Sequence, residues 1–328
     1  MSEKIISQAI KQAEIDIRNK CSVLKQQDLL GFGIFIGSLL SIALCWTYYI
    51  QYGDTYTEYI IVVLLIAFFT SFLHELEHDL IHNLYFKRNI MMQDIMFMCI
   101  WLAKLHGNPW FRRELHLKHH IISGQREDAE ERLIGLGIPI SLKRMAVTIH
   151  PYGSLIIMST VSKDAKWLDV KRMNLTTMPI ATIFFILNKL YILYILIMHI
   201  VGYNNFHNYI SSNIWKFIYS SNILIILPNI LRQSCLVLMS NCSHYYGDIP
   251  EKSVFYQNQI LDHPIFFPFQ LFCVNFGATH IVHHYVPGQP FYIRELVYRR
   301  VKSLLIDQGV RINDFGAITR GNLYYDDS

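Results

Sequence analysis

Four long apolar runs constrain this chain more than any other feature of its sequence. Residues 30–50 carry no charge over 21 positions. At a helical rise of about 1.5 Å per residue, such a run crosses a hydrocarbon core of roughly 30 Å. Residues 59–73, 176–201 and 215–231 form the other three runs. Because backbone groups find no water inside a bilayer, each run should be a helix. The sequence predicts an all-helical, polytopic membrane protein with about four transmembrane helices.

The distribution of charge indicates how these helices are oriented. Residues 51–58 contain two acids and no Lys or Arg, and residues 202–213 contain no charge, whereas residues 87–144 are dense in Lys and Arg. By the positive-inside rule, both termini and the long segment 74–175 face the cytoplasm. That segment should form a helical cap on the cytoplasmic side. Its basic residues alternate with acids and flank membrane spans, which disfavours nucleic-acid binding.

Three regions follow from this pattern. Residues 1–29 are polar and amphipathic, with both signs of charge, and should form a cytoplasmic N-terminal helix with no cleavable signal peptide. Residues 30–290 should form the membrane domain, and residues 291–328 a cytoplasmic tail. Two short apolar stretches, 91–105 and 265–278, are expected to lie at the membrane interface.

The third apolar run contains Lys189, which would be costly in the middle of a bilayer. Two interpretations are open. The span begins near Leu190 and leaves Lys189 at its cytoplasmic edge, or Lys189 meets a substrate carboxylate.

Six cysteines show no CxxC pair. This spacing is typical of free thiols in a reducing compartment and argues against a built-in rubredoxin or iron–sulfur module.

The histidines gather in three clusters at helical spacing. Positions three and four apart share a helix face, so each cluster projects several imidazoles in one direction. Neutral imidazole is a ligand for iron, zinc, copper and nickel. An even number of predicted spans separates the second cluster from the third, so all clusters can meet on one side of the membrane. The clustered histidines are His74, His78 and His82; His116, His119 and His120; His280, His283 and His284; and a further candidate, His244.

Other chemistries compete for these histidines. His74-Glu-Leu-Glu-His78 is a literal HExxH, the zinc-protease signature, but a zinc site needs about three protein ligands and leaves most clustered histidines unexplained. A metal transporter would place histidines within the spans or on both sides of the membrane, whereas these clusters are expected on one side. Eight or nine histidines suffice for two metals with four or five ligands each. Two irons at a membrane face indicate activation of O2 and attack on an unactivated C–H bond of an acyl or alkyl chain.

The clusters also carry a family resemblance. In their order around four spans they resemble the membrane fatty acid desaturase and alkane hydroxylase superfamily, whose histidine boxes hold two irons. His74–His78 is similar to the first box of alkane hydroxylases, whereas His78-Asp-Leu-Ile-His82 followed by Phe86 is similar to that of desaturases, so His74 and His82 stay alternatives. The second and third clusters match the remaining boxes. Asn241, three residues before His244, resembles the motif that supplies an extra ligand and is a candidate to support it.

The resemblance implies a lipid-metabolising, O2-dependent fatty acid desaturase with two irons per chain in a bacterial inner membrane, with its active site in the cytoplasm. It equally covers hydroxylases and enzymes that form terminal alkenes. Electrons should come from a separate donor of the ferredoxin, rubredoxin or cytochrome b5 type, because no haem module is visible in the sequence.

The remaining histidines and several neighbours are assigned no ligand role. Two interpretations are open for the acids of the first cluster, Glu75, Glu77 and Asp79: they orient imidazoles, or they are solvated charges near the bilayer surface. His199 and His207 are expected on the outer side, and His106, His150 and His263 are isolated. Trp110, Tyr245 and Tyr246 are expected to serve in packing.

Overall fold

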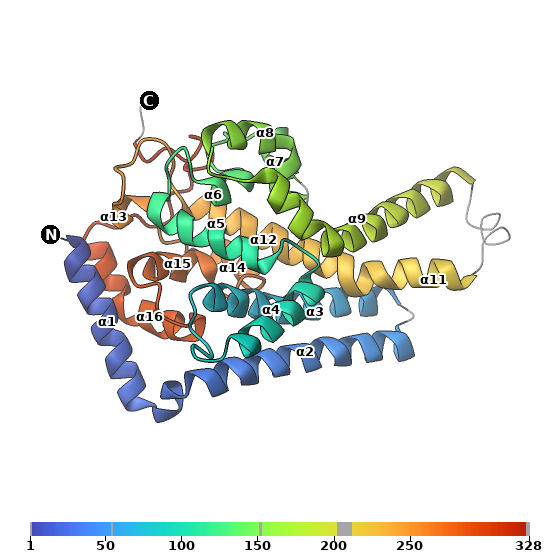
Figure 1. Ribbon diagram of the computed structural model, residues 1–328, viewed down its shortest axis with the longest axis horizontal. Helices are drawn as coiled ribbons and strands as arrows, with labels where there is room; N and C mark the ends of the chain where they lie inside the picture. Colours follow the sequence, from blue (N-terminus) through green and yellow to red (C-terminus); the bar gives the residue numbers. More distant parts are fainter. Residues whose placement is uncertain (1, 54, 151–152, 202–211, 326–328) are drawn as a thin grey trace.

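The four apolar runs form long helices in the computed structural model, which describes residues 2–53, 55–150, 153–201 and 212–325 (Figure 1). Four helices are long and apolar enough to cross a membrane, as predicted. The first two are α2 (Gln27–Tyr52) and α3 (Tyr56–Ile81), and the third lies in α9 (Val170–Val201). The fourth joins α11 (Ser212–Ser221) to α12 (Leu227–Ser243) through a π-helical turn, Asn222–Ile226. Large apolar side chains point outward on these helices, as expected for lipid contact; they include Leu40, Leu44, Leu196 and Ile200.

The turn between α2 and α3 is fixed by the start of α3. The Thr55 hydroxyl accepts a hydrogen bond from the Glu58 backbone N–H, and the Glu58 carboxylate accepts one from the Thr55 N–H. This capping box satisfies two of the N–H groups that a helix start leaves unpaired. α3 then continues without a break to Ile81, so the first histidine cluster forms the last turns of a spanning helix.

The third span differs from the prediction in where it begins. α9 starts at Val170, and its candidate span, Ile180–Ile200, contains Lys189 well inside it. The interpretation that the span begins near Leu190 is therefore wrong. The Lys189 ammonium lies over the Phe185 ring, 5.4 Å from its centroid, and Lys189 is not among the residues that line the cavity described below.

Shorter helices surround the cluster-bearing ends of the spans. The predicted short helix at 91–105 is α4, whereas the stretch at 265–278 is broken into short pieces before α15 begins. Among the described residues there is no strand, only isolated bridges. The shorter helices are α4 (Ile90–Lys104), α5 (Pro109–Ile122), α6 (Ala129–Leu133), α7 (Leu142–Ile149), α8 (Ser154–Asp164), α13 (Val254–Gln257), α14 (Phe267–Gln270), α15 (Phe276–Tyr285) and α16 (Phe291–Asp307). There are also 3-10 turns at Ser22–Lys25 and Pro264–Phe266.

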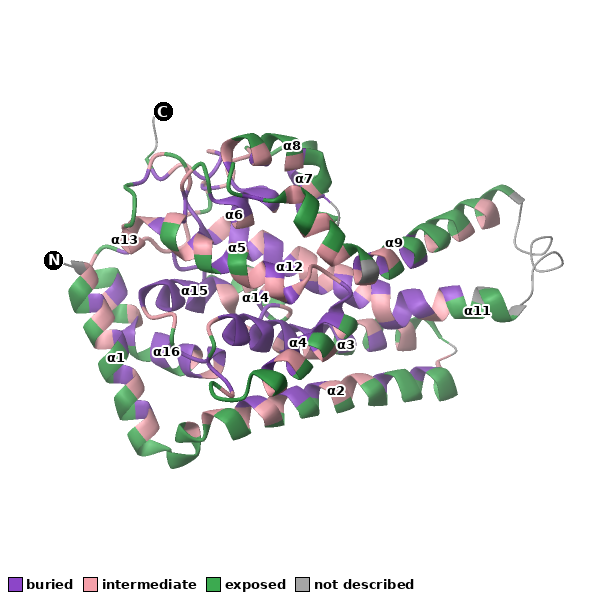
Figure 2. Ribbon diagram, in the orientation of Figure 1, coloured by how far each residue is buried: buried purple, intermediate pink, exposed green. Residues whose placement is uncertain are grey.

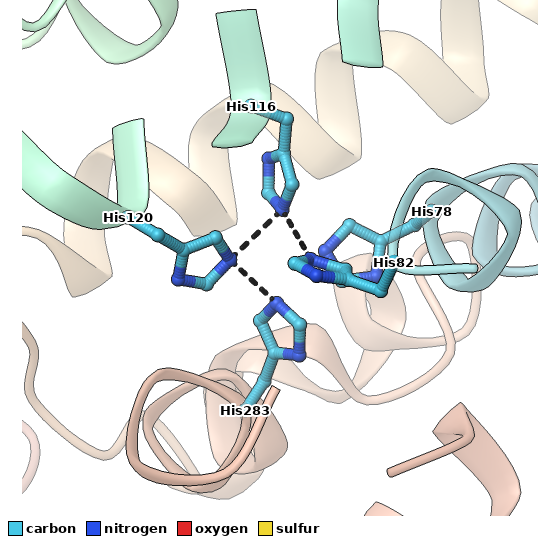
Figure 3. A group of neighbouring side chains, drawn as sticks. All are labelled: His78, His82, His116, His120 and His283. Atoms are coloured by element: carbon cyan, nitrogen blue, oxygen red, sulfur yellow. Dashed lines mark hydrogen bonds between the residues drawn. The ribbon is translucent and has the colours of Figure 1, made fainter. Parts of the chain in front are cut away.

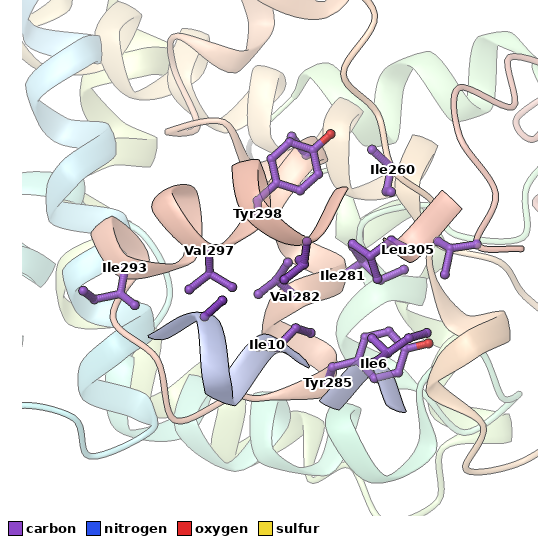
Figure 4. Packing of buried hydrophobic residues seen from close by; sticks show 14 of the residues in the cluster. Ile6, Ile10, Ile260, Ile281, Val282, Tyr285, Ile293, Val297, Tyr298 and Leu305 are labelled. Carbon is purple, nitrogen blue, oxygen red and sulfur yellow. The ribbon is translucent and has the colours of Figure 1, made fainter. Parts of the chain in front are cut away.

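The N-terminal helix α1 (Ser2–Lys20) packs against the C-terminal part of the chain (Figure 4). Ile6, Ile10 and Ile17 recur at helical spacing and are buried against residues of α15 and α16 such as Val282 and Val297. The polar segment predicted at 1–29 is thus amphipathic, and its apolar face covers the helix that carries the third histidine cluster.

Burial is greatest where α3, α12 and α15 meet, while α9 and α11 carry many exposed residues away from this region (Figure 2). All six cysteines are free, as predicted.

Candidate metal centre

Nine histidines from four helices converge into two neighbouring groups. Within each group, ring nitrogens, one from each residue, all lie within 4.8 Å of one another. α3 supplies two histidines, α5 and α15 three each, and His244 caps the end of α12. The five-histidine group contains His78, His82, His116, His120 and His283, and the four-histidine group contains His119, His244, His280 and His284.

In the five-histidine group the Nε2 atoms face a common centre (Figure 3). His116 Nε2 lies 3.0 Å from His82 Nε2 and 3.1 Å from His120 Nε2, and His283 Nε2 lies 2.9 Å from His120 Nε2. The Nε2 atom of His78 is buried without a hydrogen-bond partner. A buried polar atom without a partner costs free energy, and a neutral imidazole carries only one N–H. Converging lone pairs of this kind fit a metal ion.

The four-histidine group has the same character and is fully buried. His284 Nε2 lies 3.3 Å from His119 Nε2 and 3.0 Å from His280 Nε2, and His280 Nε2 lies 3.1 Å from His244 Nε2. The two groups are adjacent, because the His120 and His284 rings are 4.8 Å apart, centroid to centroid. Two metal ions held here would be close neighbours.

The outer nitrogens of several of these rings have partners of their own. Asp128 Oδ2 lies 2.8 Å from His119 Nδ1, and Glu130 Oε2 lies 2.8 Å from His116 Nδ1. Such contacts fix the tautomer and the orientation of a metal-binding imidazole. Gln257 Oε1 and the Ser240 carbonyl approach the Nδ1 atoms of His284 and His244, at 3.0 and 2.8 Å.

The pKa values follow from burial and from these partners. Burial lowers the pKa of His82 to about 4 and that of His244 to about 3, which keeps both rings neutral. Burial also acts to lower the pKa of His119, but the charge of Asp128 and its hydrogen bond outweigh burial and raise that pKa to about 9. A metal ion bound at His119 would therefore have to displace a proton.

Comparison with known families identifies this arrangement. The chain matches the fatty acid desaturase family over residues 57–316, a segment that contains both histidine groups. It belongs to this family. Among curated proteins, none matches the chain significantly.

Two of the three acids in the first histidine cluster, Glu75 and Asp79, contact the C-terminal helix α16. The Arg294 guanidinium donates hydrogen bonds to Glu75 (3.1 Å) and Asp79 (2.9 Å), and it lies 3.4 Å from His78 Nδ1. Asp79 also accepts hydrogen bonds from the Phe291 N–H and the Tyr85 hydroxyl. These acids are buried, so they hold α3 and α16 together rather than face solvent.

Two of the candidate site residues, His74 and Asn241, lie outside both histidine groups. The His74 ring lies within hydrogen-bond distance of the Lys104 ammonium (2.9 Å, at Nδ1) and of the Arg112 guanidinium (3.2 Å, at Nε2). The Asn241 amide donates to the carbonyls of Ile134 and Val237, at 2.9 and 2.8 Å. Asn241 thus ties α12 to the segment after α6 and does not face the histidines.

Of the histidines that were assigned no ligand role, those among the described residues belong to neither group. His199 lies on α9, His263 precedes a 3-10 turn, and His207 falls outside the described residues. The three aromatic residues expected in packing have such contacts: the Trp110 ring packs against Phe97, the Tyr245 ring against Tyr324, and Arg132 lies over the Tyr246 ring.

Sequence reasoning missed the acids that hold the second cluster. Asp128 and Glu130 belong to a run of acids just beyond His120, and this run was the available signal. Gln257 carries no comparable signal, because it is far from every cluster in sequence and reaches His284 through the fold.

A cavity of about 260 Å³ adjoins the metal centre. Three histidines of the two groups, His78, His116 and His280, form part of its wall. Much of the rest is apolar, including Phe111, Val147, Met158, Phe184 and Leu236, which come from α5, α7, α8, α9 and α12. An apolar chain of a substrate can therefore lie against the histidines with little exposure to water.

Proposed function

We propose that this protein is an O2-dependent membrane oxidoreductase that holds two irons and oxidises an unactivated C–H bond of a fatty acyl chain, with desaturation as the outcome. The observation that carries the proposal is the pair of adjacent, buried histidine groups beside an apolar cavity. Membership of the fatty acid desaturase family supports it.

The donor set suits iron. Five and four imidazoles exceed the roughly three protein ligands of a catalytic zinc site, and imidazole is a ligand that iron accepts. In an HExxH protease His74 and His78 would share one zinc, but the His74 ring is engaged with Lys104 and Arg112. When bound, two neighbouring irons would supply the activation of O2 that C–H oxidation requires.

The chain's own residues would position and shield this chemistry. We assign the first-box ligands to His78 and His82. Asp128 and Glu130 would hold the His119 and His116 rings in the orientation that a metal needs. We infer that Asn241 acts indirectly: it fixes the end of α12, from which His244 projects.

The substrate and its surroundings follow from the same features. The apolar cavity wall would hold the hydrocarbon chain and exclude water from it. We place both termini, the helical cap and the metal centre on the cytoplasmic side of a bacterial inner membrane, and we expect electrons from a ferredoxin, rubredoxin or cytochrome b5 type of donor. We prefer desaturation because the chosen first box, His78 to His82 followed by Phe86, is similar to that of desaturases.

Elemental analysis of the purified protein tests the metal assignment. We expect close to two irons per chain and little zinc, one iron for each histidine group. One zinc and no iron would contradict the proposal and favour the HExxH alternative.

Product analysis tests the reaction. The protein would be expressed in a host without such enzymes, supplied with an electron donor, and its fatty acids and volatile hydrocarbons would be analysed by mass spectrometry. New double bonds in fatty acids of unchanged length are the expected result. Hydroxy acids or chain-shortened 1-alkenes, with no new unsaturated acid, would replace desaturation by hydroxylation or alkene formation.

A further inference from the structure

A cluster of buried cations lies one helical turn from the metal ligands. The basic cluster consists of Lys104, Arg112 and Arg232, from α4, α5 and α12. Lys104 and Arg232 have only 3% and 1% of their surface exposed. The cluster shares one carboxylate, because Lys104 donates to Glu77 Oε2 (2.8 Å) and Arg112 donates to Glu77 Oε1 (2.5 Å).

The acids near the basic cluster do not balance its charge. Glu130 lies 3.7 Å from Arg112 Nε, but its other oxygen contacts His116. Glu75 is paired with Arg294. Lys104 and Arg112 therefore share Glu77 and part of Glu130, and no acid among the described residues is paired with Arg232, although buried charges in proteins are normally paired.

The Arg232 side chain also has donor atoms without a hydrogen-bond partner. Its Nη2 donates to the side chain of Gln233, while its Nε and Nη1 are buried without a hydrogen-bond partner. Arg232 therefore has donors that the protein itself leaves unused. Its neighbour in the chain, Gln233, lines the cavity together with Lys104 and Arg112.

The cavity connects two members of the basic cluster, Lys104 and Arg112, to the metal centre. Lys104, Arg112 and Gln233 line it together with His78 and His116. On α5, Arg112 precedes His116 by four residues, which is about 6 Å along a helix axis. The same spacing on α3 separates His74, the hydrogen-bond partner of Lys104, from His78. The cavity therefore has cations close to the histidines and an apolar wall beyond them.

We propose that the basic cluster binds the carboxylate of a free fatty acid whose chain lies along the apolar wall of the cavity. This inference rests on the proposed function and specifies its substrate. Guanidinium and ammonium groups are the usual partners of carboxylates, and a guanidinium can bind one through two parallel hydrogen bonds. Lys104 is buried, so a carboxylate that reaches it is buried as well, and a large polar carrier such as coenzyme A would have to be taken out of water with it. The C–H bonds nearest to the histidine groups are then those of the first few carbons of the chain.

Equilibrium binding of tritiated palmitate to the purified, detergent-solubilised protein tests this site. The assay needs no electron donor and no turnover. We expect palmitate to bind about tenfold more tightly than methyl palmitate, which has the same chain without the charge. Lys104→Met should remove most of this preference and leave the affinity for the methyl ester unchanged, whereas Lys166→Met, at an exposed position, should change neither affinity.

Glu77→Gln provides a variant that should gain binding. It removes the carboxylate that competes for Lys104 and Arg112 but keeps a hydrogen-bond acceptor, so palmitate should bind more tightly and methyl palmitate should not. Equal affinities of the wild-type protein for acid and ester would overturn the proposal, as would palmitoyl-CoA displacing palmitate at equal concentration. If these results came with two bound irons and O2-dependent oxidation intact, only the carboxylate site would fail. Selective palmitate binding by a protein that takes up no iron would instead refute the proposed function.

Discussion

Alanine substitutions at His74 and His82 should have different effects, one on stability and the other on iron affinity. Each residue lies one helical turn from His78, but the side chains of the two contact different residues. His82 Nε2 lies 3.0 Å from His116 Nε2 inside the five-histidine group. Loss of a contact that merely orients a ligand typically lowers metal affinity ~10–100-fold, or ~1.4–2.7 kcal/mol. His82→Ala, which removes a proposed ligand, should weaken iron binding at this group by at least that amount. The four-histidine group should be unaffected, since none of its members comes from α3.

His74→Ala should leave iron affinity unchanged and lower stability instead. It removes the one acceptor nitrogen that the neutral ring offers to the neighbouring Lys104 and Arg112, and an unpaired buried donor costs about 1–3 kcal/mol. Iron retained during titration with a chelator measures the first effect, and thermal unfolding in detergent measures the second. His199→Ala, on α9 away from both groups, is the matched control. Iron loss in His74→Ala with full retention in His82→Ala would refute the assignment of the first box.

Three further predictions concern the support of the centre, its folding and its orientation. Asp128→Asn should lower the iron affinity of the four-histidine group ~10–100-fold, because the His119 ring loses its charged partner; unchanged chelator titration would contradict this. Gly124→Ala should destabilise the protein by about 1–3 kcal/mol, because Gly124 has a φ of +76° and an added Cβ would meet a backbone oxygen at 2.8 Å. The control Gly33→Ala, where nothing lies within 4 Å, should not lower the melting temperature. Reporter fusions at both termini should indicate the cytoplasm, and an external signal from either would refute the orientation.

The sequence predicted the spans and the ligand-bearing helices because both depend on local periodicity. An apolar run of sufficient length has one stable form in a bilayer, and His116, His119 and His120 share a face of any helix. Periodicity could not choose between His74 and His82, because each is one turn from His78. The choice depends on the side of α3 against which α5 packs, which only the tertiary structure reveals.

Contacts between distant parts of the sequence also could not be predicted from local periodicity. Arg294 reaches Glu75 and Asp79 across most of the chain, and α1 covers α15 although nearly the whole sequence separates them. The break within 265–278 likewise arises from tertiary context, since Val274 and Asn275 adopt positive φ values of 47° and 56° just before α15. Apolar composition indicated only a short stretch at the membrane interface and not this break.

The position of α15 sets the order in which the centre can be assembled. His283 belongs to one histidine group, and His280 and His284 belong to the other, so neither group is complete without this helix. A ribosome delivers the chain from its N-terminus, and all four candidate spans precede α15. During synthesis the spans can therefore enter the bilayer while both groups still lack members. Iron held as proposed would therefore be captured late, after insertion of the spans and after α15 has packed against α1 and α16.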